Sequence, residues 1–123
     1  ITMATLYLPL KKEWYEMIES GVKFEEYREI KPYWIKRWVV YADGYKIPEF
    51  MLEVYSEHIT NLKILLSESK LEFIDFDFIK FSYGYTKRTM TFECKGITIG
   101  KGRKEWGAPD EDVFIIKLGK RTE

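Results

Sequence analysis

The chain has 123 residues, a length that suits one domain with a single hydrophobic core. It is 46% hydrophobic and 33% charged, which excludes an intrinsically disordered chain. The 20 acidic and 20 basic residues balance, so the net charge does not mark a nucleic-acid-binding protein. Any basic surface must therefore come from local clustering of lysine and arginine.

The cysteine count and the hydropathy pattern indicate the cellular setting. Cys94 is the single cysteine, so no internal disulfide can form and a reducing, cytoplasmic location is expected. No apolar run approaches the roughly 20 residues that cross a membrane, and no signal peptide is recognisable, so we expect no membrane partner. Ile1 and Thr2 precede Met3 and are interpreted as a cloning remnant, which leaves one domain over residues 3–123.

The first third of the chain predicts strands and helices in alternation. Residues 6–10 are typical of a short strand, and residues 11–20 carry apolar side chains at the i, i+3 and i+4 spacing of a helix. Gly21 suits the left-handed conformation in which many helices end. Residues 23–28 predict a second strand, and Pro32 favours the start of a short helix.

The middle of the chain is less regular. Asp43 and Gly44 form a turn signal between residues 39–42 and 45–47, which together predict a small hairpin. Residues 49–70 have the apolar spacing of packed helices.

The last third predicts mainly strands. Residues 76–85 have strand character, and the apolar parity changes across Gly96 between residues 89–94 and 97–99, which indicates a β-bulge. Residues 113–118 are almost continuously apolar and predict a central strand buried on both faces. The sum is about six strands with two or three helices, hence an α+β fold built on a mixed or closed sheet.

Most common catalytic and metal-binding sets are absent from the sequence. His58 is the single histidine, and with Cys94 it offers two nitrogen or sulfur ligands where a zinc site needs three or four. A Ser-His-Asp or Cys-His arrangement would have to use His58, for which a solvated or capping role is favoured. We expect neither a metal nor a cofactor.

One octapeptide stands out, the segment Gly21-Val22-Lys23-Phe24-Glu25-Glu26-Tyr27-Arg28, with the pattern Gly-x-Lys-x-x-Glu-x-Arg. In a strand, Glu26 and Arg28 share a face, with Cα atoms about 7 Å apart. Lys23 has the opposite parity and joins them only from the turn after Gly21 or through a bulge. In such a network Arg28 would grip a phosphate or carboxylate, whereas spacing alone favours an exposed ion pair.

A lysine beside an arginine is also one route to a nucleophile or base, which makes Lys23 and Glu26 catalytic candidates if the protein is an enzyme.

Two further segments combine aromatic and basic side chains. Tyr33, Trp34 and Arg37 lie in the run after Pro32, where rings that stack on bases stand beside cations that meet phosphates. An equally weighted alternative places Trp34 and Trp38 in the core. The later segment offers three more candidate ligand-binding residues, Lys101, Arg103 and Trp106.

With this motif and its flanking segments, the sequence resembles the ASCH domain family of the PUA-like superfamily. The motif at residues 21–28 matches the family's Gly-x-Lys-x-x-Glu-x-Arg pattern in full. The matching flanks are residues 6–10, 31–34, 81–85, 97–102, 106–109 and 114–119. Residues 49–72 fit least and are interpreted as an insertion.

The resemblance implies a PUA-like β-barrel with flanking helices and a cleft beside the motif that holds RNA or a nucleotide. Lys23, Glu26 and Arg28 would form the cleft floor, and Tyr33, Trp34 and the late loop its walls. Relatives include RNA-binding modules, a reported ribonuclease, and an amidohydrolase acting on acylated cytidine in which the motif lysine is the nucleophile or base.

Lys23 corresponds to that lysine, but Glu26 stands where the amidohydrolase has threonine, and a carboxylate there works against a nucleophilic amine. That enzyme's second glutamate has three open counterparts here, Glu49, Glu53 and Glu57.

The leading hypothesis is an RNA- or nucleotide-binding module. The alternatives are a metal-independent hydrolase of a modified nucleoside or RNA that uses Lys23, and a protein-interaction domain that presents residues 49–72.

Overall fold

Five of the strands form one mixed sheet with the order β1-β5-β6-β7-β2 in the computed structural model, which describes residues 4–123. The strands are β1 (Thr5–Leu10), β2 (Glu25–Arg28), β5 (Phe78–Tyr83), β6 (Thr89–Lys101) and β7 (Asp112–Arg121). β1 runs parallel to β5, and the other neighbours pair antiparallel. The expectation for Ile1, Thr2 and Met3 lies outside the described residues.

A two-stranded sheet and four α-helices complete the described part of the chain. β3 (Val39–Tyr41) pairs antiparallel with β4 (Leu71–Phe73). The helices are α1 (Lys12–Glu19), α2 (Pro32–Trp38), α3 (Glu49–Glu57) and α4 (Ile59–Ser67), with a short 3₁₀ turn, η1 (Lys104–Trp106), in the late loop. The α+β class is confirmed, with one strand and one helix more than the expected maximum.

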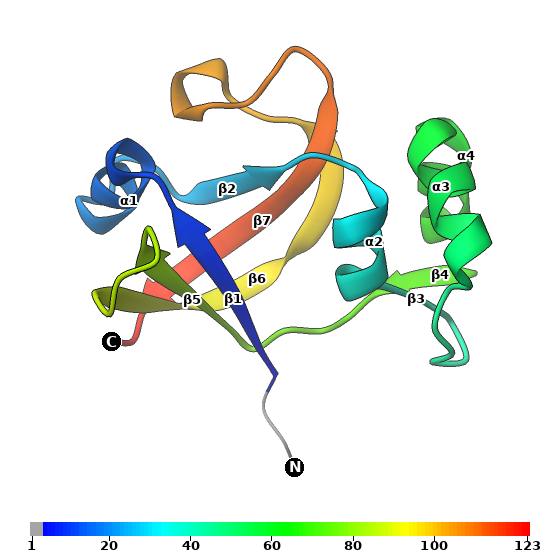
Figure 1. Cartoon of the computed structure of the whole chain (residues 1–123), viewed down its shortest axis with the longest axis horizontal. Coiled ribbons are helices and arrows are strands. Elements are labelled where there is room, and N and C mark those ends of the chain that lie inside the picture. Colours follow the sequence, from blue (N-terminus) through cyan, green and yellow to red (C-terminus); the bar gives the residue numbers. More distant parts are fainter. Residues whose placement is uncertain (1–3) are drawn as a thin grey trace.

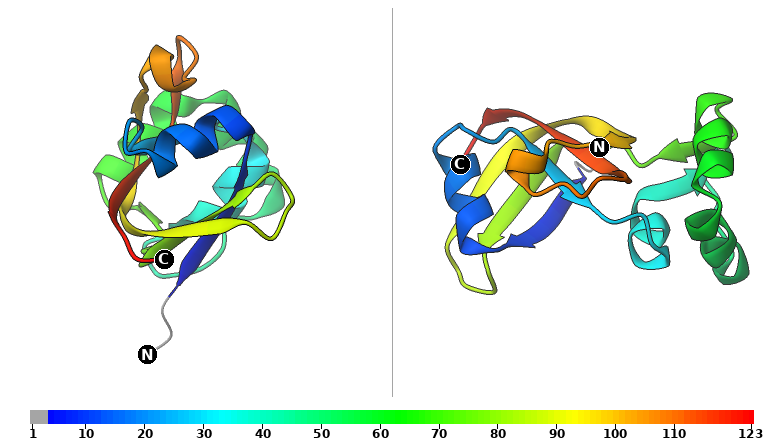
Figure 2. Two further views of the ribbon diagram at one scale, coloured as in Figure 1. Left: turned by 90° about the vertical axis from the view of Figure 1, so that its left-hand side faces the viewer. Right: turned by 90° about the horizontal axis from the view of Figure 1, so that it is seen from above.

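The large sheet curls so that its two edge strands approach each other. β1 and β2 are those edges, and Arg28 Nη2 on β2 donates a hydrogen bond to the Pro9 carbonyl on β1 at 2.8 Å. Pro9 suits an edge position because it has no backbone N–H to donate. The result is a half-barrel rather than a sheet closed by a full ladder, with α1 across one end and the α3–α4 pair at the other (Figures 1 and 2).

β6 and β7 follow the sequence pattern closely. The register of β6 against β7 shifts at Cys94 and Gly96, and Gly96 has a φ of +115°, so the predicted bulge is confirmed. β7 lies between β6 and β2, and its residues 113–116 are buried on both faces, as expected for a central strand, whereas Lys117 is exposed.

The first turn of the motif differs from the expected strand. Gly21 has a φ of +85° after α1, as predicted for a helix stop. β2 begins only at Glu25, because the Lys23 N–H bonds back to the Met17 carbonyl at 3.0 Å instead of joining a strand partner. Lys23 and Phe24 therefore link the turn to β2, and the Phe24 carbonyl already accepts a hydrogen bond from the Leu118 N–H of β7 at 3.1 Å.

The hairpin predicted around Asp43 and Gly44 is reduced to a single bridge between Val40 and Lys46. Its second arm has no room to extend, because Pro48 caps α3 two residues later. β3 pairs instead with β4, a segment 30 residues away along the chain. The helical packing expected over residues 49–70 is confirmed by α3 and α4.

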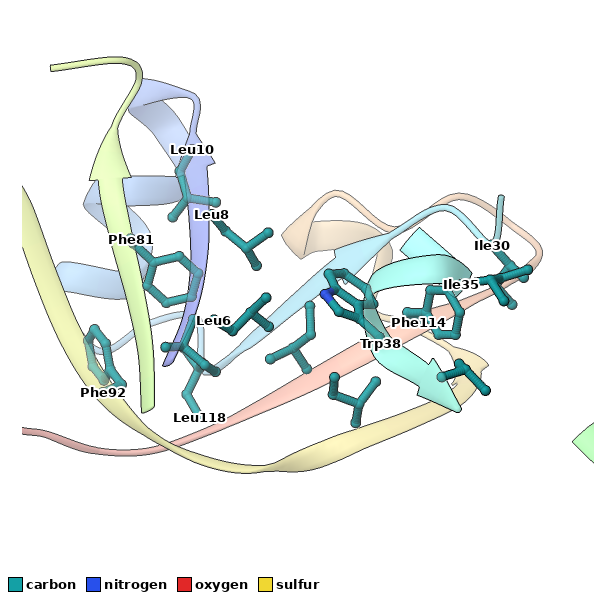
Figure 3. Packing of buried hydrophobic residues seen from close by; sticks show 14 of the residues in the cluster. Leu6, Leu8, Leu10, Ile30, Ile35, Trp38, Phe81, Phe92, Phe114 and Leu118 are labelled. Atoms are coloured by element: carbon teal, nitrogen blue, oxygen red, sulfur yellow. The ribbon is translucent and has the colours of Figure 1, made fainter. Parts of the chain in front are cut away.

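The main core lies inside the curl of the sheet. Leu6, Leu8 and Leu10 point inward from β1 and meet Phe81 of β5, while Trp38 of α2 packs against Phe114 of β7 (Figure 3). Burial of these large apolar side chains is the main source of stability. A second, smaller cluster forms under the late loop around Tyr27, Trp106, Ala108, Val113 and Ile115.

Candidate functional site

Three charged side chains of the motif, those of Lys23, Glu26 and Arg28, meet, and Lys23 reaches the other two from the turn after Gly21. Lys23 Nζ lies 3.0 Å from Glu26 Oε1, and Arg28 Nη2 lies 2.9 Å from Glu26 Oε2. Each carboxylate oxygen of Glu26 therefore forms an ion pair with one cation. Because the network holds two positive charges and one negative charge, it keeps one net positive charge.

Lys23 is buried, with 2% of its surface exposed. Its Nζ donates to the Trp106 carbonyl at 2.6 Å and lies 4.6 Å from the centre of the Trp14 ring. A carboxylate, a carbonyl and a ring face are all partners that attract a cation. Lys23 thus joins α1, β2 and the late loop from inside the protein.

Arg28 is the member of the network that reaches the surface, with 18% of its side chain exposed. Nε and Nη2 donate to Glu26 Oε2 at 3.2 and 2.9 Å, and Nη2 also donates to the Pro9 carbonyl. Within residues 4–123, Nη1 has no hydrogen-bond partner. That leaves two N–H groups of a fixed guanidinium for a ligand.

Arg28 lines two cavities, of about 660 and 400 Å³. They share the lining residues Pro9, Arg28 and Tyr85, so they adjoin each other at the seam between β1 and β2. Glu26 lines the smaller cavity, whereas Lys23 lines neither. We call the two adjoining cavities together the Arg28 groove.

The aromatic-basic run of α2 forms one wall of the larger cavity. Tyr33, Trp34 and Arg37 all line it. Arg28 lies 5.3 Å from the Trp34 ring centre, and Arg37 lies 3.5 Å from that of Tyr33. Trp38 stacks on Trp34 at 4.7 Å and is fully buried in the core, and both rings are part of the lining of the larger cavity.

Sequence reasoning missed several of the lining residues, among them Tyr7, Lys11, Trp14 and Tyr85. Tyr7 and Tyr85 are 69% and 97% exposed, and both line the larger cavity, as does Lys31. Lys11 lines the smaller cavity. A signal existed for Tyr7, because the alternation of inward leucines along β1 turns it outward.

The late loop lies apart from the Arg28 groove. Lys101, Arg103 and Trp106 line neither of its two cavities. Trp106 is a buried member of the smaller core cluster, and Arg103 lies 4.3 Å from its ring centre. Lys101 is exposed, with Asp110 at 3.9 Å. The walls of the groove are therefore formed by residues of α2 and β1 and not by the late loop.

Tyr27 anchors that loop to β2. Its hydroxyl donates to Glu25 Oε1 at 2.8 Å and accepts from the Arg103 N–H at 3.1 Å. Burial and the neighbouring Glu25 carboxylate raise the pKa of Tyr27 to about 12, against the opposing effect of the Arg103 N–H. Tyr27 is therefore a neutral, structural hydroxyl at physiological pH.

The remaining candidates lie away from the groove. His58 is exposed at the junction of α3 and α4, in a capping position. Glu49, Glu53 and Glu57 belong to α3, and none of them lines a cavity with Arg28. Residues 49–72 expose Phe50, Val54 and Ile64 on the two helices.

Within residues 4–123, no cluster of three or more histidine, cysteine, aspartate or glutamate side chains is arranged to hold a metal ion. In the same residues no helix has both the length and the apolar character needed to cross a membrane. Comparison with known proteins found no matching family model, no matching curated protein and no matching solved structure.

Proposed function

We propose that the protein is an ASCH domain with a PUA-like fold and that its Arg28 groove binds single-stranded RNA or a nucleotide. The observation that carries the proposal is the free edge of the Arg28 guanidinium, which lies in a groove walled by aromatic rings. A phosphate oxygen accepts hydrogen bonds from such an edge, and bases stack on such rings.

The charge distribution of the groove supports an anionic ligand. Arg28, Lys31 and Arg37 line the larger cavity, and among the described residues no carboxylate does. This clustering occurs in a chain whose formal net charge is zero, so it is a local property of the groove. A local patch of three cations suits a nucleotide or a short single strand better than a long duplex.

Lys23 supports binding by compensating Glu26. Without Lys23, the Glu26 carboxylate would neutralise Arg28, whose free edge would then attract an anion less strongly. With Lys23 bonded to the other carboxylate oxygen, the network retains a positive charge at its exposed end. The burial of Lys23 away from both cavities gives the alternative proposal, a hydrolase with Lys23 as nucleophile, no support.

The experiment is a binding titration with a fluorescently labelled single-stranded RNA, with UMP as competitor. Arg28→Gln should weaken binding at least about tenfold, because it removes a charged hydrogen-bond donor from the ligand. Arg121→Gln is the matched control, since Arg121 lies at the end of β7 outside both cavities. Circular dichroism checks that both variants fold.

Equal affinity of Arg28→Gln and the wild type would contradict the proposal. So would a wild-type protein that binds neither the RNA nor UMP.

A further inference from the structure

Arg28 stands where the two cavities of its groove meet. Pro9 and Tyr85 are the other residues common to both linings. Arg28 therefore lies at the junction of two spaces rather than at the end of one, and its Nη1 has no hydrogen-bond partner among the described residues.

Each cavity is large enough to act as a separate subsite. Volumes of about 660 and 400 Å³ both fall in the range of small-ligand pockets, roughly 300–1,000 Å³. A single nucleotide held at Arg28 would leave one of the two spaces empty.

Both subsites offer a ring for a base. Trp34 and Tyr33 line the larger cavity, Trp14 lines the smaller one, and the exposed Tyr85 ring borders both. Base–aromatic stacking tolerates any base because every base has a π face. Two bases on either side of one cation match the repeat of a single strand, in which a phosphate joins neighbouring nucleosides.

The charges of the two subsites differ in a way that fits this arrangement. Lys31 and Arg37 line only the larger cavity, which suits the phosphate that continues the strand. The smaller cavity has Lys11 and the Glu26 carboxylate. Glu26 is buried and its charge is balanced by Lys23 and Arg28. Among the described residues, Lys11 is therefore the one further cation in the lining of the smaller cavity, which suits a base better than a second phosphate.

We propose that the groove recognises a dinucleotide step of single-stranded RNA, with the bridging phosphate at Arg28 and one base in each cavity. This inference rests on the proposed function and adds the size of the recognised unit and its position. It also assigns a binding role to Lys11 and Trp14, which the motif does not include.

The test compares three probes by isothermal titration calorimetry: UMP, the dinucleotide UpU, and UpU with an uncharged methylphosphonate linkage. UpU should bind at least about fivefold tighter than UMP, because the second base adds stacking. The methylphosphonate analogue should bind at least about tenfold more weakly than UpU, because its linkage has no negative charge to pair with the Arg28 guanidinium.

Lys11→Glu gives the second arm, with Lys12→Glu as the matched control. Both lysines are exposed, but Lys12 lines neither cavity of the groove. Lys11→Glu should weaken UpU about fivefold, whereas Lys12→Glu should leave the affinity for UpU unchanged.

Equal affinities for UMP and UpU would overturn the dinucleotide proposal while the proposed function stands. A Lys11→Glu variant that binds UpU like the wild type would also overturn it. Failure of every probe to bind would overturn both.

Discussion

Lys23 contributes to the candidate site without touching the groove. Its ammonium lies 3.0 Å from Glu26 and 2.6 Å from the Trp106 carbonyl, and it lines neither cavity beside Arg28. A motif lysine of this kind is easily taken for a catalytic base. The burial of Lys23 and its ion pair with Glu26 indicate a structural role, in which Lys23 holds Glu26 in place and balances its charge.

Lys23→Met should destabilise the fold by about 3 kcal/mol, because removing one partner of a buried ion pair leaves the other uncompensated. Urea unfolding followed by tryptophan fluorescence measures the change. Lys101→Met is the control, since Lys101 is exposed and its substitution should stay within about 0.5 kcal/mol. Equal stability of Lys23→Met and the wild type would show that Glu26 does not depend on Lys23.

At the scale of elements, the late loop is positioned by close packing on β2. A Cβ built on Gly102 would lie 2.6 Å from the Tyr27 ring and 2.7 Å from Ala108, so only glycine fits there. A Cβ on Gly100 would lie 3.5 Å from Ile115, an ordinary contact. The loop is thus a structural support of the motif, which agrees with its position outside the groove.

Gly102→Ala should cost about 1–3 kcal/mol, because the added methyl group overpacks the smaller core cluster. Gly100→Ala, two residues earlier, should change stability by no more than about 0.5 kcal/mol. Thermal unfolding of the two variants checks the difference. If both glycines tolerate alanine equally, the Tyr27 ring is not fixed by the loop.

Local patterns predicted most elements but few of their partners. The alternation along β1 and the parity change at Gly96 are properties of neighbouring residues, so the sequence alone sufficed to predict them. The parallel pairing of β1 with β5 joins Thr5 to Phe78. β3 pairs with β4, although the sequence predicted a hairpin between β3 and residues 45–47. Such partners depend on long-range packing, which no short segment encodes.

The candidate site was predictable to the same degree. The charge spacing of the motif gave Lys23 the opposite parity to Glu26 and Arg28 and left the turn after Gly21 as one way to join them, and the structure shows the three side chains together. Tyr85 and Lys11 could not be found, because they join the groove only when the half-barrel brings distant segments to the seam beside Arg28. Arg103 and Trp106 resemble a binding wall in sequence, but Trp106 is buried in the smaller core cluster and Arg103 packs over its ring.

For the whole molecule, the four tryptophans report where a ligand binds. Trp34 lines the larger cavity of the Arg28 groove and Trp14 the smaller one. Trp38 lies beneath Trp34 in the core, and Trp106 lies in the separate cluster under the late loop. One titration can therefore distinguish the groove from the loop, the two surfaces that combine aromatic and basic side chains.

The measurement is a two-dimensional ¹H–¹⁵N NMR titration of the indole signals with a short single-stranded RNA, assigned by substituting each tryptophan with phenylalanine. Binding in the Arg28 groove predicts that the Trp34 and Trp14 signals move in proportion to saturation and that the Trp106 signal stays in place. Movement of the Trp106 signal alone, or no movement of any signal at a high RNA concentration, would contradict the assignment of the groove as the binding site.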